Sequence, residues 1–278
     1  MEQYYSQKIS KELHLKPGQV RAAMKLFSDG CTIPFIARYR KEATSSLDEV
    51  DLTNIRDLWR SLEDLDKRRK AILESLEKRE LLTEELEKKL RTAPNMTSLE
   101  DLYLPYRPKR KTRASAARER GLEALAQILF AQKGVNPDEK AREFLDPEKG
   151  IHTIDDALDG AGDIMAEYIS ETPEARQELR KLYVSQGLLR SLRPPKKSEK
   201  EASHYADYFD YKESLRSLPS HRILALFRGE AEGMLSLSIQ VPEDKALSLL
   251  THRFVSGNGF DSEEVRDALE DAWKRLLK

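Results

Sequence analysis

The feature that most constrains the fold is a long apolar stripe at helical spacing within residues 48–79. Its apolar members lie alternately three and four positions apart, with polar Arg69 filling the one remaining position; they are Ile55, Leu58, Leu62, Leu65, Ile72 and Leu76. This spacing places the side chains on one face of an α-helix and is the pattern of a coiled coil. The sequence therefore predicts one long, coiled-coil-like helix that buries this face against other helices.

The composition favours a mainly α fold built from several units. Charged residues make up 35% of the 278 residues and hydrophobic residues 39%, which is typical of long amphipathic helices with hydrated polar faces. A chain of this length favours two or three units. We therefore predict an elongated multi-helix architecture with a small α+β unit at its C-terminal end.

Capping residues and prolines locate the predicted elements. We expect helices over residues 17–28, 84–91 and 122–132, and helices that begin after Pro137, Thr153 and Pro173. Residues 30–46, where Pro34 prevents a continuous helix, are interpreted as a structured connection, and residues 103–113 as an irregular basic loop. The last predicted helix covers residues 262–278.

Residues 235–241 alternate between apolar and polar side chains and give the clearest strand pattern in the chain. Its pairing partner stays open, because residues 221–227 fit a helix or a strand; we favour a helix capped by Ser220. The predicted organisation is a helical segment with a structured connection (1–46), a long-helix region with the basic loop (47–113), a helical bundle (114–192), a linker (193–202) and a small α+β or helical unit (203–278).

The net charge of the chain does not indicate an anionic binding partner. There are 48 Lys and Arg residues against 49 Asp and Glu, so any electrostatic footprint must be local. The single cysteine, Cys31, fits a reducing, cytoplasmic compartment, and we expect neither a secretion signal nor a membrane-spanning segment. Cys31 has no base nearby in sequence, so we interpret it as a buried structural residue.

The densest basic run lies in residues 103–120, where seven basic residues oppose one acidic residue. Its cations could contact phosphates while Tyr103 and Tyr106 stack on exposed bases. The predicted nucleic-acid-binding residues are Arg107, Lys109, Arg110, Lys111 and Arg113. The alternative is a salt-bridged structural clasp, because residues 136–178 contain 13 acidic and 4 basic residues that could neutralise the loop. Both interpretations stay open.

Two further clusters are weighed against packing. Residues 38–41 read RYRK and interleave cations with an aromatic ring, but they follow an apolar run, so we favour packing at a domain interface. His221, Arg222 and Arg228 could bind an anion, yet the neighbouring apolar residues favour a buried fold element; these are Leu224, Leu226 and Phe227.

The sequence contains no assignable catalytic residue, metal site or cofactor site. Its many carboxylates show no spacing that singles out a metal or an acid/base pair, and a GxxxxGK[ST] phosphate loop is missing. We therefore expect this chain not to be an enzyme.

Four stretches carry a family resemblance: IPFIARYRKE (33–42), LEDLYLPYRPKRKTR (99–113), DYFDY (207–211) and SHRILALFRGE (220–230). Together they closely resemble the N-terminal part of the Tex family of bacterial transcription accessory proteins. The resemblance implies a longer protein in which an RNase-H-like domain, helix-hairpin-helix modules and a C-terminal OB-fold RNA-binding domain follow. It also implies a pair of glycines where this chain has Ser45 and Ser46, so the turn there is expected to differ in backbone geometry.

The resemblance favours a nucleic-acid-associated transcription accessory scaffold that binds RNA or DNA weakly through this region, with the transcription machinery as a further candidate partner. The alternative is a protein-interaction scaffold that uses the long helix or the acidic region and does not bind nucleic acid. A hydrolase is suggested only by the RNase-H-like domain of longer relatives, which this sequence does not contain.

Overall fold

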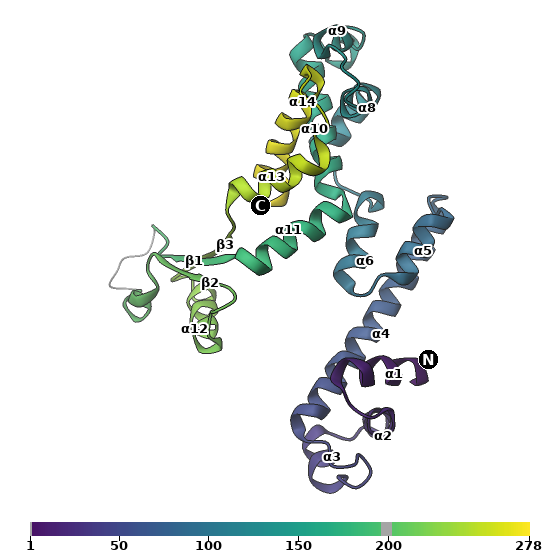
Figure 1. The fold of residues 1–278 in the computed structure, drawn as a ribbon, viewed down its shortest axis with the longest axis vertical. Coiled ribbons are helices and arrows are strands. Elements are labelled where there is room, and N and C mark those ends of the chain that lie inside the picture. The colour runs from purple at the N-terminus through teal and green to yellow at the C-terminus, as the bar shows by residue number, and fades with distance from the viewer. Residues whose placement is uncertain (1, 196–201) are drawn as a thin grey trace. The chain divides into compact units, whose positions relative to one another are not determined.

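The computed structural model describes residues 2–195 and 202–278, which are predominantly helical with one small sheet (Figure 1). The predicted mainly α fold with a long helix and a small α+β element is confirmed. The chain forms two compact units, Met1–Tyr106 and Arg107–Lys278. Residues 196–201 of the predicted linker 193–202 lie outside the described residues.

In the described part of the Met1–Tyr106 unit, all regular secondary structure is helical. Its elements are α1 (Glu2–Leu13), α2 (Pro17–Ser28), α3 (Ile33–Tyr39), α4 (Glu49–Lys78), α5 (Glu84–Thr92), α6 (Met96–Tyr103) and a 3-10 turn at Leu104–Tyr106. Asp48 caps α4 by accepting from the Asp51 N–H at 2.7 Å, and Thr83 caps α5 by accepting from the Leu86 N–H at 3.2 Å. These caps fix the ends of the predicted long helix and of the helix after it.

The long helix α4 runs past α1, α2 and α3 with its first half and past α5 and α6 with its second half (Figure 1). It contributes side chains to two hydrophobic cores. Leu52, Ile55 and Leu62, on its first half, are buried against α1, α2 and α3. On its second half, Leu65, Ile72 and Leu76 are buried with apolar residues of α5 and α6. The heptad stripe is therefore covered from within the unit, first by one set of helices and then by another.

Arg69, the polar member of the stripe, caps the end of α5. Its guanidinium donates from Nε to the Leu90 carbonyl and from Nη2 to the Ala93 carbonyl, both at 3.0 Å. It also pairs with Asp66, one turn earlier on α4. The last carbonyls of a helix lack partners within the helix, so a cation that reaches them is well placed.

Asp66 also accepts a hydrogen bond from the Tyr5 hydroxyl of α1 at 2.7 Å. Burial and this bond to a carboxylate raise the pKa of Tyr5 to about 12. Asp66 therefore contacts both Tyr5 of the first core and Arg69, which is hydrogen-bonded to the backbone of the second core. The two cores meet at this polar contact.

The connection predicted for residues 30–46 contains the seven-residue helix α3. Pro34 lies in its first turn, where a missing N–H costs no helical hydrogen bond, so the proline starts this helix instead of preventing it. After α3, Ser45 and Ser46 adopt φ values of 51° and 66°, the left-handed region that favours glycine. The two serines therefore occupy a backbone conformation for which glycine is better suited.

Replacing both serines by glycine is expected to stabilise the Met1–Tyr106 unit by about 1 kcal/mol, because the relieved left-handed strain exceeds the extra backbone entropy of glycine. The hydrogen bonds at this turn survive, since the Gln19 side chain donates to the Ser45 carbonyl and the Ser46 N–H donates to Lys41. Denaturant unfolding measures the change. The matched control, Ser61→Gly on the exposed face of α4, should destabilise by about 0.5 kcal/mol; a loss of stability in the double variant would contradict the strain argument.

The Arg107–Lys278 unit combines a helical bundle with a small sheet. Its helices are α7 (Arg113–Glu119), α8 (Glu123–Phe130), α9 (Pro137–Arg142), α10 (Ile154–Glu171), α11 (Pro173–Gln186), α12 (Ser220–Ala231), α13 (Glu243–Phe254) and α14 (Phe260–Asp271), which continues as a π-helix over Ala272–Leu277. Short 3-10 turns lie at Pro147–Lys149 and Ser203–Tyr208. The helices predicted after Pro137, Thr153 and Pro173 are therefore present.

Helix α10 is the centre of the bundle and packs against α7, α8, α9, α11 and α14 (Figure 1). One core joins these helices to α13 and α14, so apolar residues from both sides of the predicted 193–202 linker are buried together. Gly160 allows the Leu122 side chain to pack directly against the backbone of α10, because a Cβ at this position would lie 2.3 Å from Leu122 Cδ1. Helix α10 therefore lies beside α7 and beside the basic segment that precedes α7.

The sheet consists of β1 (Leu188–Leu192), β2 (Tyr211–Ser214) and β3 (Ser236–Gln240), in the antiparallel order β2-β1-β3. It confirms the strand predicted near residues 235–241, whose partner is β1. Helix α12 confirms the helix favoured for residues 221–227, but it begins after Pro219 and Ser220 makes no side-chain cap. Of the three residues expected to be buried there, only Leu226 is; Leu224 is 71% exposed and Phe227 55%.

Candidate nucleic-acid interface

The basic segment is extended or irregular from residue 107 to residue 112 and then enters α7. Thr112 caps this helix: its hydroxyl accepts from the Ser115 N–H at 3.0 Å, and its own N–H donates to the Ser115 hydroxyl at 2.8 Å. Arg113, the last predicted binding residue, is therefore the first residue of α7. The cap fixes where the irregular segment ends.

Glu167 of α10 gathers this segment and α7 around one carboxylate. Lys109 Nζ lies 3.0 Å from Glu167 Oε1 and 2.5 Å from Glu171 Oε1. Arg118 Nη1 lies 2.6 Å from the same Glu167 oxygen, and the Thr112 hydroxyl donates to Glu167 Oε2 at 3.1 Å. Only 9% of the Glu167 side chain is exposed, so the group is largely withdrawn from water. Lys109 is thus held by ion pairs on α10. We call this cluster of Lys109, Thr112, Arg118, Glu167 and Glu171 the clasp.

The two glutamates of this clasp differ in their electrostatics. Burial opposes ionisation of Glu167, but hydrogen bonds from Arg118 and Lys109 outweigh it and hold the pKa of Glu167 below its usual value. Burial dominates at Glu171 and raises the pKa of that carboxyl. The clasp therefore depends on the charge of Glu167 more than on that of Glu171.

The other predicted binding residues are more accessible. Arg107 and Arg110 are exposed and, within the described residues, make no ion pair. Lys111 is 75% exposed and lies 3.6 Å from Glu119, which is a weak surface pair. Arg113 is exposed and lines a groove whose other charges are acidic. The structure therefore separates the five predicted binding residues into one ion-paired lysine, Lys109, and four more exposed cations.

The two tyrosines considered as stacking residues belong to the Met1–Tyr106 unit. Tyr103 is only 6% exposed and packs in the second core, with the Arg68 guanidinium 5.6 Å from its ring centroid. Tyr106 is half-buried against the same core, and its carbonyl accepts from Arg79 Nη1 at 2.6 Å. Tyr103 is therefore too buried to stack on a base, which was one of the possible roles considered for this ring.

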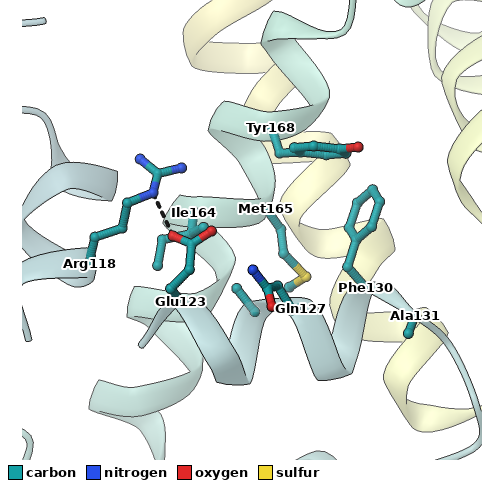
Figure 2. Close-up of a pocket in the computed structure, with 9 residues that line it drawn as sticks. Arg118, Glu123, Gln127, Phe130, Ala131, Ile164, Met165 and Tyr168 are labelled. Atoms are coloured by element: carbon teal, nitrogen blue, oxygen red, sulfur yellow. Dashed lines mark hydrogen bonds and ion pairs between the residues drawn. The ribbon is translucent and has the colours of Figure 1, made fainter. Parts of the chain in front are cut away.

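A pocket of about 380 Å³ lies beside the clasp, between α8 and α10 (Figure 2). The Arg118–Glu123 ion pair, 2.6 Å long, stands on one side of it, and Met165, Phe130 and Tyr168 line the other side. The Phe130 and Tyr168 rings meet edge to face at 4.9 Å between centroids. The position of Arg118 is thus fixed between this pocket and Glu167, and the sequence did not single out Arg118 or its partners as a site.

An acidic groove of about 520 Å³ runs between α10 and α14. Burial raises the pKa of Asp163 and, with repulsion from neighbouring carboxylates, that of Glu264. The charged lining is Arg113, Asp155, Asp159, Asp163, Glu264, Asp267 and Asp271. Within the described residues, no group of three His, Cys, Asp or Glu side chains is arranged to hold a metal ion.

The remaining candidates from the sequence lie in different places. Arg222 pairs with Glu213 at 3.0 Å and donates to the Tyr211 hydroxyl at 3.2 Å, so it supports the small sheet, while His221 and Arg228 are exposed. Cys31 is half-buried and free. Residues 38–41 are all exposed, so the packing predicted for them is not found within their unit.

Two family descriptions match the chain. "Tex-like protein N-terminal domain" covers residues 3–77, and "Tex central region-like" covers residues 132–276, which is more than half of the chain. The chain belongs to the Tex family. Over 236 residues it is 44% identical to the protein tex of Bordetella pertussis, covering 85% of this chain and 30% of that protein.

Other Tex relatives align over nearly the whole chain. The transcriptional accessory protein Tex of Neisseria gonorrhoeae is 35% identical over 277 residues, which are 97% of this chain and 36% of that protein. The human S1 RNA-binding domain-containing protein 1 is 27% identical over 285 residues, with 98% and 28% covered. The chain therefore spans about a third of the length of these relatives. Among the residues that the structure describes, no helix is both long enough and apolar enough to cross a bilayer.

Proposed function

We propose that this chain forms helical architecture for a nucleic-acid-associated transcription accessory protein of the cytoplasm and contacts RNA or DNA weakly through its basic segment. The proposal takes its biological setting from the Tex relatives, one of which is named a transcriptional accessory protein and another an S1 RNA-binding domain-containing protein. Protein components of the transcription machinery are further candidate partners.

The observation that carries the nucleic-acid contact is the pair of exposed arginines, Arg107 and Arg110, on a segment anchored at Lys109. Neither arginine has an ion-pair partner in the described structure, so neither must leave a carboxylate to reach a phosphate. The clasp of Lys109 limits how far the segment can move. Such cations bind the backbone of a nucleic acid but lack the positioned donors that read base edges, so the contact is independent of sequence.

Alanine replacement of Arg107, Arg110 and Lys111 together is expected to weaken binding and flatten its dependence on salt. Each lost phosphate contact removes about 0.7 from the slope of log K against log salt for single strands, so the triple variant should lose about 2. Fluorescence anisotropy with labelled RNA and DNA of matched sequence, at several salt concentrations, measures both quantities. Adding Lys109→Ala and Arg113→Ala completes the predicted set.

The matched control is alanine replacement of three exposed cations elsewhere in the same unit, Arg142, Lys181 and Lys212. It changes the net charge equally, so it should leave most of the affinity if the basic segment is the contact. Equal losses of affinity in both triple variants would show that the binding is a general electrostatic attraction and not a contact made by the basic segment. An unchanged slope in a folded five-residue variant would instead favour the purely structural clasp.

The second candidate is a protein-interaction scaffold, favoured by the exposed apolar residues Leu224 and Phe227 on α12. It predicts no salt-sensitive affinity for nucleic acid. For the isolated chain we also propose no nuclease or nucleotide-hydrolase activity. Reproducible turnover that one local substitution abolishes would contradict this.

A further inference from the structure

The motif IPFIARYRKE contributes an exposed aromatic and basic surface that the proposed function does not use. Phe35 is 39% exposed and Tyr39 71%, and their ring centroids lie 5.5 Å apart with the planes tilted by 42°. Arg38, Arg40 and Lys41 are exposed beside them in sequence. We call these five residues the α3 patch.

The α3 patch is held rigidly from below. Ile36 and Ala37 are buried in the first core, so the short helix is anchored on its other face. After the helix, the Thr44 N–H donates to the Arg40 carbonyl at 3.2 Å and the Ser46 N–H donates to the Lys41 carbonyl at 2.8 Å. Binding to such a surface loses little conformational entropy in the protein.

Two of the three cations of the α3 patch make no ion pair within the described residues, and the third lies over an aromatic ring of the patch. Arg38 and Lys41 make no ion pair there, and the Arg40 guanidinium lies 5.8 Å from the Phe35 ring centroid, in a cation–π arrangement. Glu42 is the one acidic residue in the motif. The local charge is therefore positive, directly beside two accessible rings.

We propose that the α3 patch binds an unpaired stretch of nucleic acid, with a base stacked on Tyr39 and phosphates contacted by Arg38 and Lys41. This rests on the proposed function in that the chain must encounter nucleic acid, but it places a second contact in the other unit. Exposed rings with interleaved cations are the combination by which proteins hold single strands. A protein interface favours fewer charges at its centre, and a duplex keeps its base faces within the stack.

The test uses the full chain, a labelled single-stranded oligonucleotide in RNA and DNA forms, and a duplex of equal length. Tyr39→Ala should weaken single-strand binding about 5- to 100-fold with an unchanged salt slope, because stacking carries no net charge. Tyr39→Phe should retain binding, since it keeps the ring. Arg38→Ala with Lys41→Ala should lower the salt slope by about 1.4.

Two matched controls separate the α3 patch from general effects. Tyr4→Ala removes a tyrosine that is 56% exposed on α1, and Lys11→Ala with Lys25→Ala removes two exposed cations from the same unit. Both should bind like the unaltered chain, and circular dichroism verifies the fold of every variant.

Three outcomes overturn the proposal: single-strand affinity unchanged by Tyr39→Ala, equal losses in the controls, or no nucleic-acid binding by the intact chain. If the basic-segment variants lose affinity while the α3-patch variants keep it, the proposed function stands and this inference fails. If only the α3-patch variants lose affinity, the α3 patch is supported as the contact and the basic segment is not the binding site.

Discussion

Glu167→Gln is expected to lower the free energy of unfolding of the Arg107–Lys278 unit by about 2–3 kcal/mol at neutral pH, because it removes the buried negative charge that holds Lys109 and Arg118. Chemical denaturation followed by circular dichroism measures this loss. Glu171→Gln is the matched control and should cost less than about 1 kcal/mol, since burial already raises the pKa of that carboxyl. Equal losses in the two variants would contradict the assigned roles.

The pH dependence gives an independent check on Glu167. Its pKa is lowered in the folded protein, so its charge stabilises the fold above the unfolded-state pKa of about 4.5, and this contribution disappears as the pH falls through the lower folded value. The difference between the unaltered chain and Glu167→Gln should therefore be constant near neutrality and shrink in acid. A difference that keeps its neutral-pH size after Glu167 has become protonated would point to lost packing instead.

The same variant connects the clasp with the proposed contact. Without the Glu167 charge, Lys109 and Arg118 are less strongly held and can reach phosphates. We therefore expect Glu167→Gln to strengthen nucleic-acid binding and to increase the salt slope by up to about 1.4 for a single strand. The clasp would then limit affinity as well as supporting the fold.

Arg69→Leu is expected to destabilise the Met1–Tyr106 unit by about 3 kcal/mol, although leucine completes the apolar heptad series. The leucine cannot donate to the Leu90 and Ala93 carbonyls, and hydrogen bonds from charged groups contribute about 1.5–3 kcal/mol each. Thermal and urea unfolding of the chain measure the effect.

The controls for Arg69 separate its capping role from its charge. Arg69→Lys should also destabilise, because an ammonium group cannot reproduce the two-carbonyl contact. Lys67→Ala removes a cation that is 75% exposed, 3.8 Å from Asp64, and should change the stability by less than about 0.5 kcal/mol. Stabilisation by Arg69→Leu would show that the position acts only as a gap in the apolar stripe.

Local sequence signals predicted much of this fold because helix caps and periodicity act over a few residues. Thr83, Asn136 and Thr153 accept hydrogen bonds from the first turns of three of the predicted helices. Pro34 misled the prediction because the same residue that interrupts a helix is tolerated in a first turn. Strand β1 was missed because it is short and immediately follows the α11 pattern.

The candidate site depended on contacts that sequence distance conceals. An acidic region that neutralises the basic run was one of two open interpretations, but nothing in the sequence selected Glu167 among the acidic residues of 136–178, because the choice is made by how α7 packs on α10. Likewise, Leu224 and Phe227 were expected to be buried because they are apolar and lie in a helix, but both are exposed. An apolar pattern shows which face of a helix is hydrophobic, but tertiary packing decides which element, if any, covers that face.

The division of α4 between two cores imposes a phase relationship along the helix. Leu62 ends the set that packs with α1–α3, and Leu65 begins the set that packs with α5 and α6. One residue added between them would rotate one stripe by about 100° relative to the other, whereas seven would restore nearly the same azimuth. An insertion at that turn that does not return the second stripe to its azimuth would therefore expose one of the two sets, so the 30-residue helix α4 sets the angular register of the Met1–Tyr106 unit.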